Sequence, residues 1–401
     1  MHPLAITGLS VVSPVGVGRE AFFAALADPV AAKKRAFAGP RSVLTDARFA
    51  RAIVAEVSDF DAAQYLGDKG LRNFDRMTRL LVVAAKHALE DAGLKREGAF
   101  ASVGPERLGI CAATAYGSLD SITEINRVAE LEHPRYLNPS RFPNTVINSA
   151  AGYVSIWEGL EGPNVTIVDG NCGGANAVLT AETHIACGRA DALMVGGAEV
   201  VSEPLYLAFE KLGVISEGDR PSEPGDVTSR GTHLGEGAAL LVCESLESAA
   251  ARGAKVWAEI VGFGTAFDPP FSEAQLVHAS DVTVERAVRA ALADAGIEPE
   301  QVDLVACAAS GVSRVDLAEE EGLARVFGSD VATVATKGIW GETFGAAAAL
   351  SMAAAVGFLS GIEPKPLLRG DAPREVRHVL ITALGYYGNV SAVILRKRDQ
   401  A

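Results

Sequence analysis

The chain has 401 residues and the composition of a globular protein, with 49% hydrophobic and 21% charged residues. Its formal net charge of −14 argues against a nucleic-acid-binding surface, and an acidic partner would need a local basic patch. It contains no run of about 18 apolar residues, so no membrane span is expected. The first residues show no signal-peptide pattern, which favours a cytoplasmic location.

In the first half of the chain, apolar strand-like runs alternate with helical stretches, which predicts an α/β fold with layered sheets. A turn at Gly8 is expected after the first strand, and Gly93 is expected to end a helix. The expected strands are 4–6, 108–112, 165–168, 192–195 and 238–243. The expected helices are 19–27, 76–92 and one that follows Cys172 and runs to about Gly188.

The second half repeats this order of elements. Its expected strands are 256–263, 302–306 and 331–335, with a closing hairpin of 379–383 and 391–395, and its expected helices are 282–295, 317–327 and 346–360. The repetition predicts two similar halves, residues 1–250 and 251–401, that bury one shared core. Because the Ala-rich helices are apolar nearly all round, they are expected to lie between sheets.

Cys172 is the first candidate for chemistry. It lies in the segment Asp169-Gly170-Asn171-Cys172-Gly173-Gly174, between an apolar strand and an Ala-rich helix. At the first turn of a helix, free backbone N–H groups and the helix dipole favour a thiolate, and flanking glycines allow a substrate carbonyl to approach. This setting makes Cys172 a candidate acyl-accepting nucleophile, although a buried cysteine is often just a small apolar residue.

The other cysteines, at positions 111, 187, 243 and 307, form neither a CxxC motif nor the Cys/His spacing of a zinc site. This pattern predicts reduced thiols and no metal site.

Several segments, taken in order, are similar to the β-ketoacyl-acyl-carrier-protein synthases. They are the opening strand and turn (6–16), the segment 65–81 that resembles the family's first long helix, the Gly-Pro-Asn before the cysteine strand (162–164), and the join of the halves (234–239 and 251–255). The resemblance runs from end to end of the chain. It implies the thiolase fold, an α/β fold of two pseudo-symmetric halves in a five-layer αβαβα arrangement, which is usually dimeric.

The resemblance also implies a chemistry. In this family a cysteine holds the acyl chain as a thioester, and two histidines stabilise the enolate formed when malonyl carrier protein decarboxylates. Cys172 matches the cysteine, with a preceding strand one residue longer than the family's, and Lys337 matches a lysine of the site. Asp316 and Glu319 match an acidic pair, and together with Ser310 they are assigned to substrate binding.

Both family histidines are absent. The first falls on Ala308 or Ser310, depending on register, and the second falls on Glu342. An ionised Glu342 would repel an enolate and raise the pKa of the nearby thiol, and each lost oxyanion donor costs on the order of 10²–10³ in rate. Condensation by this chain alone is therefore not expected. The histidines that are present do not fall at either of these two motif positions. They are at positions 2, 87, 133, 184, 233, 278 and 378.

A narrower resemblance is to the chain-length-factor subunits of type II polyketide systems, which pair with a true ketosynthase and lack its catalytic residues. It rests on residues 309–328 and on Gly385-Tyr386-Tyr387-Gly388-Asn389, where active synthases carry a second glycine in place of Tyr387. These subunits commonly have glutamine where Cys172 stands here.

Two functions remain open on the sequence. In the first, the chain is a non-condensing partner of a ketosynthase in fatty acid or polyketide assembly, and bulky residues limit chain length as the floor or gate of a pocket. The candidates, which also fit plain core positions, are Phe209, Trp340, Phe344, Tyr386 and Tyr387. In the second, the chain is a divergent acyltransferase that loads Cys172. Its oxyanion hole would come from the N–H groups of Cys172 and Tyr386, and Glu342 would act as general base for a non-malonyl acceptor or would pair with Lys337.

Either function implies docking of an acyl carrier protein, with its phosphopantetheine delivered on the carrier and no cofactor bound to this chain. Lys69 and Arg72 are the expected docking residues, within a basic cluster that also holds Arg76 and Arg79. A second basic cluster occupies residues 33–35, and each cluster also fits an ordinary solvated helix face. The expected partner subunit is a ketosynthase in a heterodimer, or a second copy in a homodimer.

Overall fold

A computed structural model describes residues 1–216, 223–226, 228–229, 231–272 and 274–398. Eleven strands follow one another across a single continuous sheet, and β2 pairs beside this path with β1. The first half contributes a run in the order β1-β8-β7-β5-β6. These strands span Leu4–Ser13 (β1), Leu108–Ala113 (β5), Asn164–Ile167 (β6), Ala192–Glu199 (β7) and Gly237–Ser245 (β8).

The second half repeats this arrangement in the order β9-β14-β13-β10-β11. Its strands span Ala258–Phe267 (β9), Leu304–Ala306 (β10), Ala332–Val334 (β11), His378–Leu384 (β13) and Asn389–Arg396 (β14). In both halves the strands therefore lie side by side in the chain order first, fifth, fourth, second, third. The halves join where β1 pairs with β9, and β13 and β14 form the expected antiparallel hairpin.

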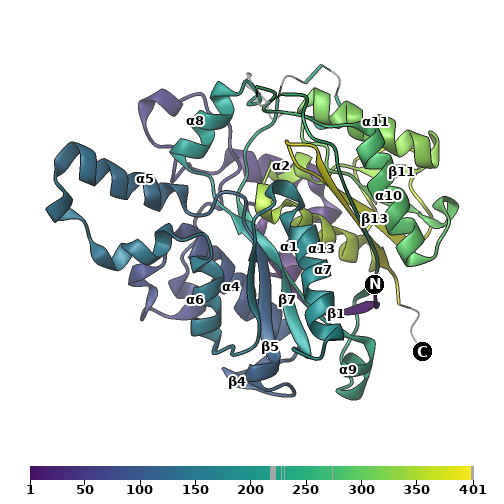
Figure 1. Ribbon diagram of the computed structural model, residues 1–401, viewed down its shortest axis with the longest axis horizontal. Coiled ribbons are helices and arrows are strands. Elements are labelled where there is room, and N and C mark those ends of the chain that lie inside the picture. The colour runs from purple at the N-terminus through teal and green to yellow at the C-terminus, as the bar shows by residue number, and fades with distance from the viewer. Residues whose placement is uncertain (217–222, 227, 230, 273, 399–401) are drawn as a thin grey trace.

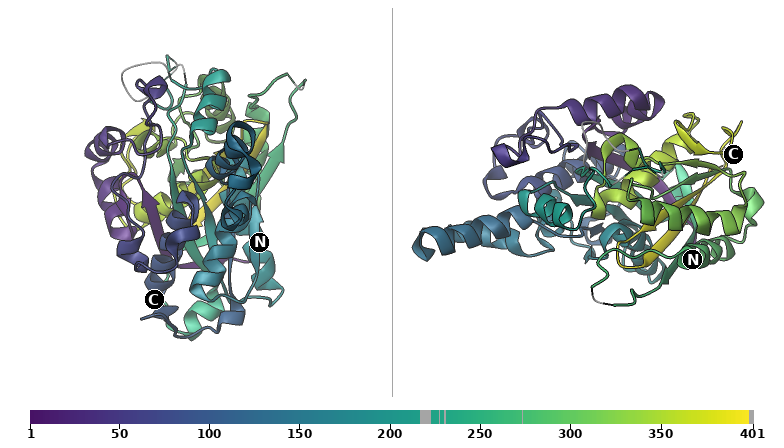
Figure 2. Two further views of the ribbon diagram at one scale, coloured as in Figure 1. Left: turned by 90° about the vertical axis from the view of Figure 1, so that its left-hand side faces the viewer. Right: turned by 90° about the horizontal axis from the view of Figure 1, so that it is seen from above.

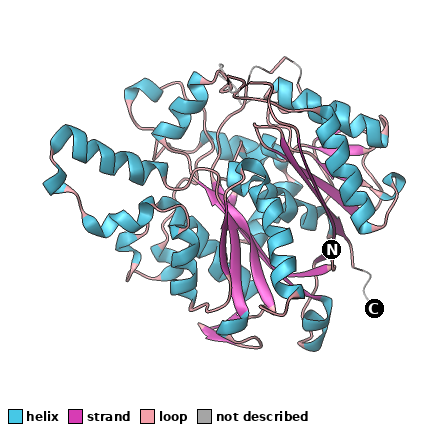
Figure 3. Ribbon diagram, in the orientation of Figure 1, coloured by secondary structure: helices cyan, strands magenta, loops and turns pink. Residues whose placement is uncertain are grey.

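Helices complete the five layers, as Figures 1 and 3 show. Helices α4 (Arg76–Asp91) and α6 (Ser149–Glu158) cover the outer side of the first half, and α10 (Asp281–Ala295) and α11 (Ser313–Phe327) cover that of the second. Helices α7 (Gly173–Ala186) and α13 (Ala347–Leu359) lie between the sheet regions and contact each other. Every residue of α13 is buried, because its many small side chains let both neighbouring layers approach closely. The predicted thiolase fold is confirmed.

The described part of the chain contains further helices and strands. The helices are α1 (Arg19–Ala27), α2 (Pro29–Ala38), α3 (Ala63–Leu66), α5 (Leu119–Arg127), α8 (Glu203–Lys211), α9 (Leu246–Ala251) and α12 (Lys337–Trp340). The strands are β2 (Gly16–Val17), β3 (Lys95–Arg96), β4 (Ala99–Phe100) and β12 (Leu367–Arg369). Short 3₁₀ helices span Ala47–Phe49, Leu71–Asn73, Pro105–Arg107, Pro134–Tyr136, Pro139–Thr145, Gly170–Cys172, Pro299–Gln301 and Phe344–Ala346, and a π-helix spans Val128–Glu132.

Gly8 is not at a turn, as the sequence predicted, but in the middle of β1. A Cβ at this position would lie 2.5 Å from the backbone nitrogen of Ala92, where α4 ends against the strand. The glycine therefore permits close packing of helix on strand rather than a change of direction. This is why β1 continues to Ser13 beyond the short segment that was expected.

Helix α5 and the short helices that follow it, residues 119–145, form an arm that projects from the body of the molecule (Figures 1 and 2). Within the described part of the chain, no helix is both long enough and apolar enough to cross a membrane.

Candidate functional site

The turn that carries Cys172 lies at the carboxyl end of β6, which runs parallel to β5, and it leads directly into α7. Two glycines follow the cysteine because α7 packs tightly at its start. A Cβ at Gly173 would lie 2.9 Å from the Ala113 Cβ, and one at Gly174 would lie 3.1 Å from the Ala349 nitrogen. Both glycines therefore serve the packing of α7 against β5 and α13.

The Cys172 side chain is fully buried and turned towards the β13–β14 hairpin. Its Sγ donates to the Ala383 carbonyl at 3.2 Å, and the Asn389 carbonyl lies 3.5 Å away. Burial, with the nearby Asp169 carboxylate, raises the pKa of the thiol to about 12. The expectation of a favoured thiolate is therefore wrong, because loss of hydration outweighs the effect of the helix start.

The backbone N–H of Cys172 also takes part in a structural hydrogen bond. Its N–H donates to the Asp169 carbonyl at 3.0 Å within the single-turn helix that precedes α7. The N–H group that the sequence assigned to an oxyanion hole is therefore already bonded.

Asn171, which the sequence analysis did not single out, is the residue of this turn that reaches the rest of the site. Its Nδ2 donates to Oε2 of Glu342 at 3.1 Å, and the residue is buried. Consecutive side chains at the turn thus face different ways, Asn171 towards Glu342 and Cys172 towards the hairpin. One feature of the sequence could have indicated this orientation. The strand before Cys172 is one residue longer than the family's, so a shift of one residue places Asn171 at the position of the family cysteine.

Glu342 is fully buried at the centre of a polar cluster. Its Oε2 accepts from Lys337 Nζ at 2.7 Å, from Tyr386 Oη at 3.2 Å and from Asn171. Its Oε1 accepts from the Phe344 N–H at 2.9 Å. The carboxylate therefore has four protein donors, and its pairing with Lys337, the alternative to a general-base role, is present.

Tyr386 belongs to this cluster as a neutral donor. Burial and the Glu342 carboxylate hold the pKa of its phenol well above the ordinary value, and the Ser310 side chain also contacts the phenol. Since the phenol keeps its proton, it donates to Glu342. The Tyr386 carbonyl accepts from the His278 N–H at 2.8 Å, which ties this loop to the segment before α10.

Four aromatic rings, those of Tyr116, Phe209, Phe344 and Tyr386, pack together beside the polar cluster. The ring of Phe344 lies 4.8 Å from that of Phe209 and 5.3 Å from that of Tyr116, between ring centroids. The ring of Phe209 lies 5.8 Å from that of Tyr386. Phe344 has a φ of 42°, a left-handed conformation that costs energy for a bulky residue and that its N–H bond to Glu342 supports. We name this set the aromatic plug.

The two other gate candidates lie outside the aromatic plug. Trp340 is buried against Phe22, at 5.1 Å between ring centroids, and Tyr387 is about half exposed.

Asp316 and Glu319, predicted to bind substrate, accept hydrogen bonds from loop backbone. Asp316 accepts from the N–H groups of Ser310 and Gly311, each at 2.9 Å, and from a third in the segment before β8. Glu319 accepts from the Ala308 N–H at 2.8 Å and from the Thr382 hydroxyl. Burial raises the pKa of Glu319 to about 7 and also raises that of Asp316. Both carboxylates anchor the loop on which the first family histidine was expected.

Two histidines approach the site through their backbones only. The His233 carbonyl accepts from the Glu342 N–H at 2.8 Å, but its ring Nδ1 lies 3.2 Å from the Ile53 carbonyl. The ring of His278 hydrogen-bonds to Asp268 at 3.0 Å. Neither imidazole is among the groups that contact Glu342 in the described part of the chain.

The predicted docking residues Lys69 and Arg72 are both exposed. Arg76, from the same basic cluster, does not belong to this surface, because it forms a partly buried ion pair with Glu236. The other basic cluster is largely used internally, since Lys33 pairs with Glu223 at 2.6 Å and Arg35 donates to the Val15 carbonyl at 2.6 Å.

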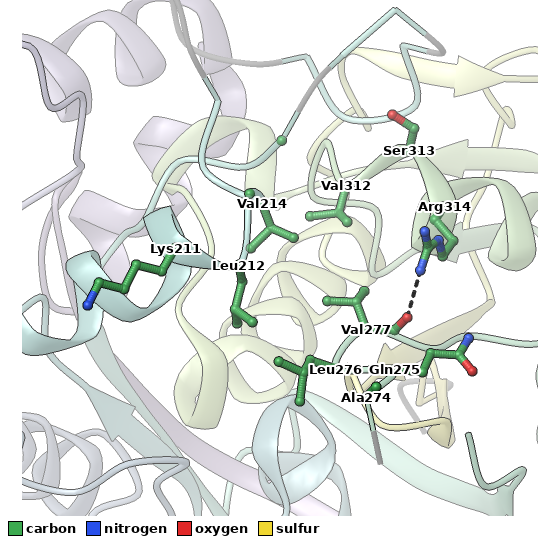
Figure 4. Close-up of a pocket in the computed structure, with 12 residues that line it drawn as sticks. Lys211, Leu212, Val214, Ala274, Gln275, Leu276, Val277, Val312, Ser313 and Arg314 are labelled. Atoms are coloured by element: carbon green, nitrogen blue, oxygen red, sulfur yellow. Dashed lines mark hydrogen bonds between the residues drawn. The ribbon is translucent and has the colours of Figure 1, made fainter. Parts of the chain in front are cut away.

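A pocket of about 460 Å³ lies at the end of α8 (Figure 4). It is bounded by residues 211–214, by the segment 274–277 and by the start of α11 at residues 312–314. Arg314 donates to the Val277 carbonyl at 3.0 Å, and the Lys211 side chain points away from the other residues drawn. None of the residues of the polar cluster lines this pocket.

Comparison with known proteins identifies the family to which the chain belongs. The profile described as "Beta-ketoacyl synthase, N-terminal domain" matches residues 1–249, and that described as "Beta-ketoacyl synthase, C-terminal domain" matches residues 257–363. The 3-oxoacyl-[acyl-carrier-protein] synthase 2 of Vibrio cholerae serotype O1 is 32% identical over 384 residues, which cover 92% of this chain and 89% of that protein.

Solved structures agree with this comparison. The ishigamide ketosynthase/chain length factor superposes with a TM-score of 0.87 at 25% identity, over 99% of this chain and 100% of that chain. A β-ketoacyl synthase from Burkholderia phymatum STM815 superposes with a TM-score of 0.85 at 26% identity, over the whole of both chains. With matching profiles for both halves, the chain belongs to the β-ketoacyl synthase family.

Proposed function

We propose that the chain is a non-condensing, chain-length-factor-type partner of an active ketosynthase, and that the pair assembles acyl chains on an acyl carrier protein in fatty acid or polyketide synthesis. One observation carries the proposal: Asn171 rather than a thiol faces the centre of the site, and Glu342 rather than an imidazole accepts its hydrogen bond. A carboxamide does not form a thioester, so an acyl chain has no acceptor on this side of the turn.

The surroundings of Glu342 also oppose an enolate. Lys337, Tyr386 and Asn171 all donate to the same carboxylate, so the donors that could stabilise a negative oxygen are already occupied. Removing a single oxyanion donor typically costs on the order of 10²–10³ in rate. A ketosynthase partner with its own catalytic residues would have to supply the condensation.

The structure does not favour the alternative of a Cys172-dependent acyltransferase. With the pKa of the thiol raised to about 12 by burial, the thiol keeps its proton near neutral pH and is a poor nucleophile. The sulfur also contacts carbonyl oxygens of the hairpin rather than the polar cluster.

Two surfaces suit a partner subunit. Strand β6 is the last strand at one end of the sheet and pairs only with β5 among the described strands, so its outer edge can pair with another chain. The arm carries exposed apolar side chains, including Leu131 at 78% and Phe142 at 66%. Such groups commonly mark an interface. The superposed ishigamide structure is described as a ketosynthase/chain length factor.

Phosphopantetheine would reach the pair on the carrier protein. Lys69 and Arg72 suit the acidic surface of a carrier, and the pocket in Figure 4 combines apolar walls with the cation Arg314. This combination suits a chain that has a phosphate at one end and an otherwise uncharged body. We therefore propose the pocket as the approach of the phosphopantetheine arm.

The test combines the chain with an intact ketosynthase encoded beside its gene. After incubation with acylated carrier protein, intact-protein mass spectrometry should show the acyl mass on the ketosynthase and none on this chain. The complex should then extend malonyl carrier protein, and Cys172→Ser should leave extension unchanged. An acyl mass on Cys172, or condensation by the purified chain alone, would overturn the proposal.

A variant of the arm separates pairing from chemistry. Leu131→Glu with Phe142→Glu should lower association with the ketosynthase by about tenfold or more, because carboxylates replace exposed apolar contacts. Phe271→Glu, at a side chain 94% exposed and outside the arm, is the matched control and should pair normally. If the chain forms only a homodimer and does not bind the ketosynthase, the proposed role is wrong.

A further inference from the structure

A groove of about 590 Å³ lies outside the polar cluster and belongs to none of the surfaces assigned above. Four parts of the chain that are far apart in sequence form it. They are helix α2, residues 223–224, helix α12 together with Ala335, and the segment that contains Pro366 and Leu368. Helix α2 contacts α12, so these two walls of the groove are packed against each other. Its volume is in the range of small-molecule sites rather than of extended protein interfaces.

The lining of the groove is mainly aliphatic and aromatic. Val30, on α2, is 78% exposed, and Leu368, from the segment after α13, is 42% exposed. Phe37 and Ile339 add to the apolar surface of the groove. A ligand that removes exposed apolar surface of this kind from water gains binding free energy from the hydrophobic effect.

The groove has few charged groups, and they differ in whether they form ion pairs. Lys33 pairs with Glu223, which neutralises both groups. Lys34 is exposed on the same helix and has no ion-pair partner among the described residues. One cation therefore remains beside an apolar hollow, in a chain whose formal net charge is −14.

We propose that this groove binds an amphiphile with one aliphatic chain and one carboxylate, that is, a free fatty acid. The aliphatic chain would lie between Val30 and Leu368, and the carboxylate would meet Lys34. The proposal is independent of the partner role, because neither the arm nor the polar cluster takes part. The groove is nevertheless connected to the polar cluster through α12, because α12 lines the groove and begins at Lys337.

The experiment titrates dodecanoate, below the concentration at which it forms micelles, into the full chain by isothermal titration calorimetry. Saturable binding of one molecule per chain is expected, together with a rise in the melting temperature that grows with ligand concentration. Val30→Glu should weaken binding by about tenfold or more, because it places a carboxylate in the apolar wall. Lys34→Glu should weaken it similarly by repelling the carboxylate of the ligand.

Matched controls and a second ligand make the result decisive. Phe271→Glu and Lys69→Glu change an exposed apolar residue and an exposed lysine elsewhere, and both should bind dodecanoate normally. Dodecanol should bind wild type and Lys34→Glu equally, but should bind Val30→Glu weakly. The proposal is overturned if binding does not saturate, if Val30→Glu and Lys34→Glu bind like wild type, or if butyrate binds as tightly as dodecanoate.

Discussion

Glu342 and Lys337 form a buried ion pair that is central to the site at the scale of single residues. Their side chains are 0% and 4% exposed, and the carboxylate also accepts from a phenol, an amide and a backbone N–H. Burying two charged groups away from water costs free energy unless the two groups are paired and hydrogen-bonded. Each charge is therefore retained because the other is present.

This dependence gives the first prediction. Glu342→Gln alone leaves an unpaired ammonium, and Lys337→Met alone leaves an unpaired carboxylate, so each should lower the free energy of unfolding by about 3–5 kcal/mol. The double variant should lose clearly less than the sum of the two single losses. Urea unfolding of the four proteins measures this difference. Additive losses would show that the two residues do not depend on each other.

At the scale of elements, buried carboxylates hold the loops around the site in place. Glu319 on α11 accepts from the loop after β10 and from Thr382 on β13, so one side chain joins three elements. Glu199, at the end of β7, accepts from the Ala115 N–H at 2.6 Å and the Gly345 N–H at 3.2 Å, and burial raises its pKa to about 7. The shape of the site therefore depends on how helices and strands meet.

The second prediction follows from the raised pKa of Glu319, which is about 7 in the folded protein against an ordinary value of 4.5. The folded state then binds the proton more tightly than the unfolded state. The stability that this proton contributes is present below pH 4.5 and is lost as the pH rises to 7. The stability of wild type relative to Glu319→Gln should therefore fall between pH 5 and 8, by no more than about 3 kcal/mol.

Urea unfolding at several pH values measures this difference. Glu199 is present in both proteins, so its own titration cancels in the comparison. A difference between wild type and Glu319→Gln that does not change with pH would mean that Glu319 titrates near its ordinary pKa.

At the scale of the whole molecule, the repeated strand order brings the two halves together around α7 and α13. Asn171 of the first half and Glu342 of the second meet at this junction. The outer surfaces remain free for partners, and the chain as a whole is acidic. Association with an acidic carrier protein should therefore depend on a few local cations.

The third prediction concerns those cations. Reversing the charge of Lys69 and Arg72 to Glu should weaken binding of the carrier protein, and the loss should be larger at low salt because ions screen exposed charges. Arg286→Glu, an exposed arginine on α10, is the matched control. Surface plasmon resonance at two ionic strengths measures the effect. Unchanged affinity at low salt would exclude this surface from docking.

Much of the fold could be predicted from the sequence because the spacing of apolar residues and the glycines that end helices are local features of the chain. Alternating apolar runs and glycine stops located β8, α10 and α13 to within a residue or two, and the helix expected over 19–27 is α1. The helix expected over 76–92 is α4, and the segment 65–81, which resembles the family's first long helix, is divided before α4 begins. Gly67 and Gly70 have positive φ, and Asp75 caps α4 by accepting from the Thr78 N–H at 2.8 Å.

For the site, the order of residues was enough to predict the fold family, the absence of both family histidines and the presence of Lys337 together with Glu342. The orientation of Asn171 towards Glu342, and of Cys172 towards the hairpin with a raised pKa, could be found only from the folded chain. The reason is physical. One residue of register at the end of β6 decides which side chain points inward, and the groups that raise the pKa of Cys172 or bind Glu342 come largely from segments distant in the chain.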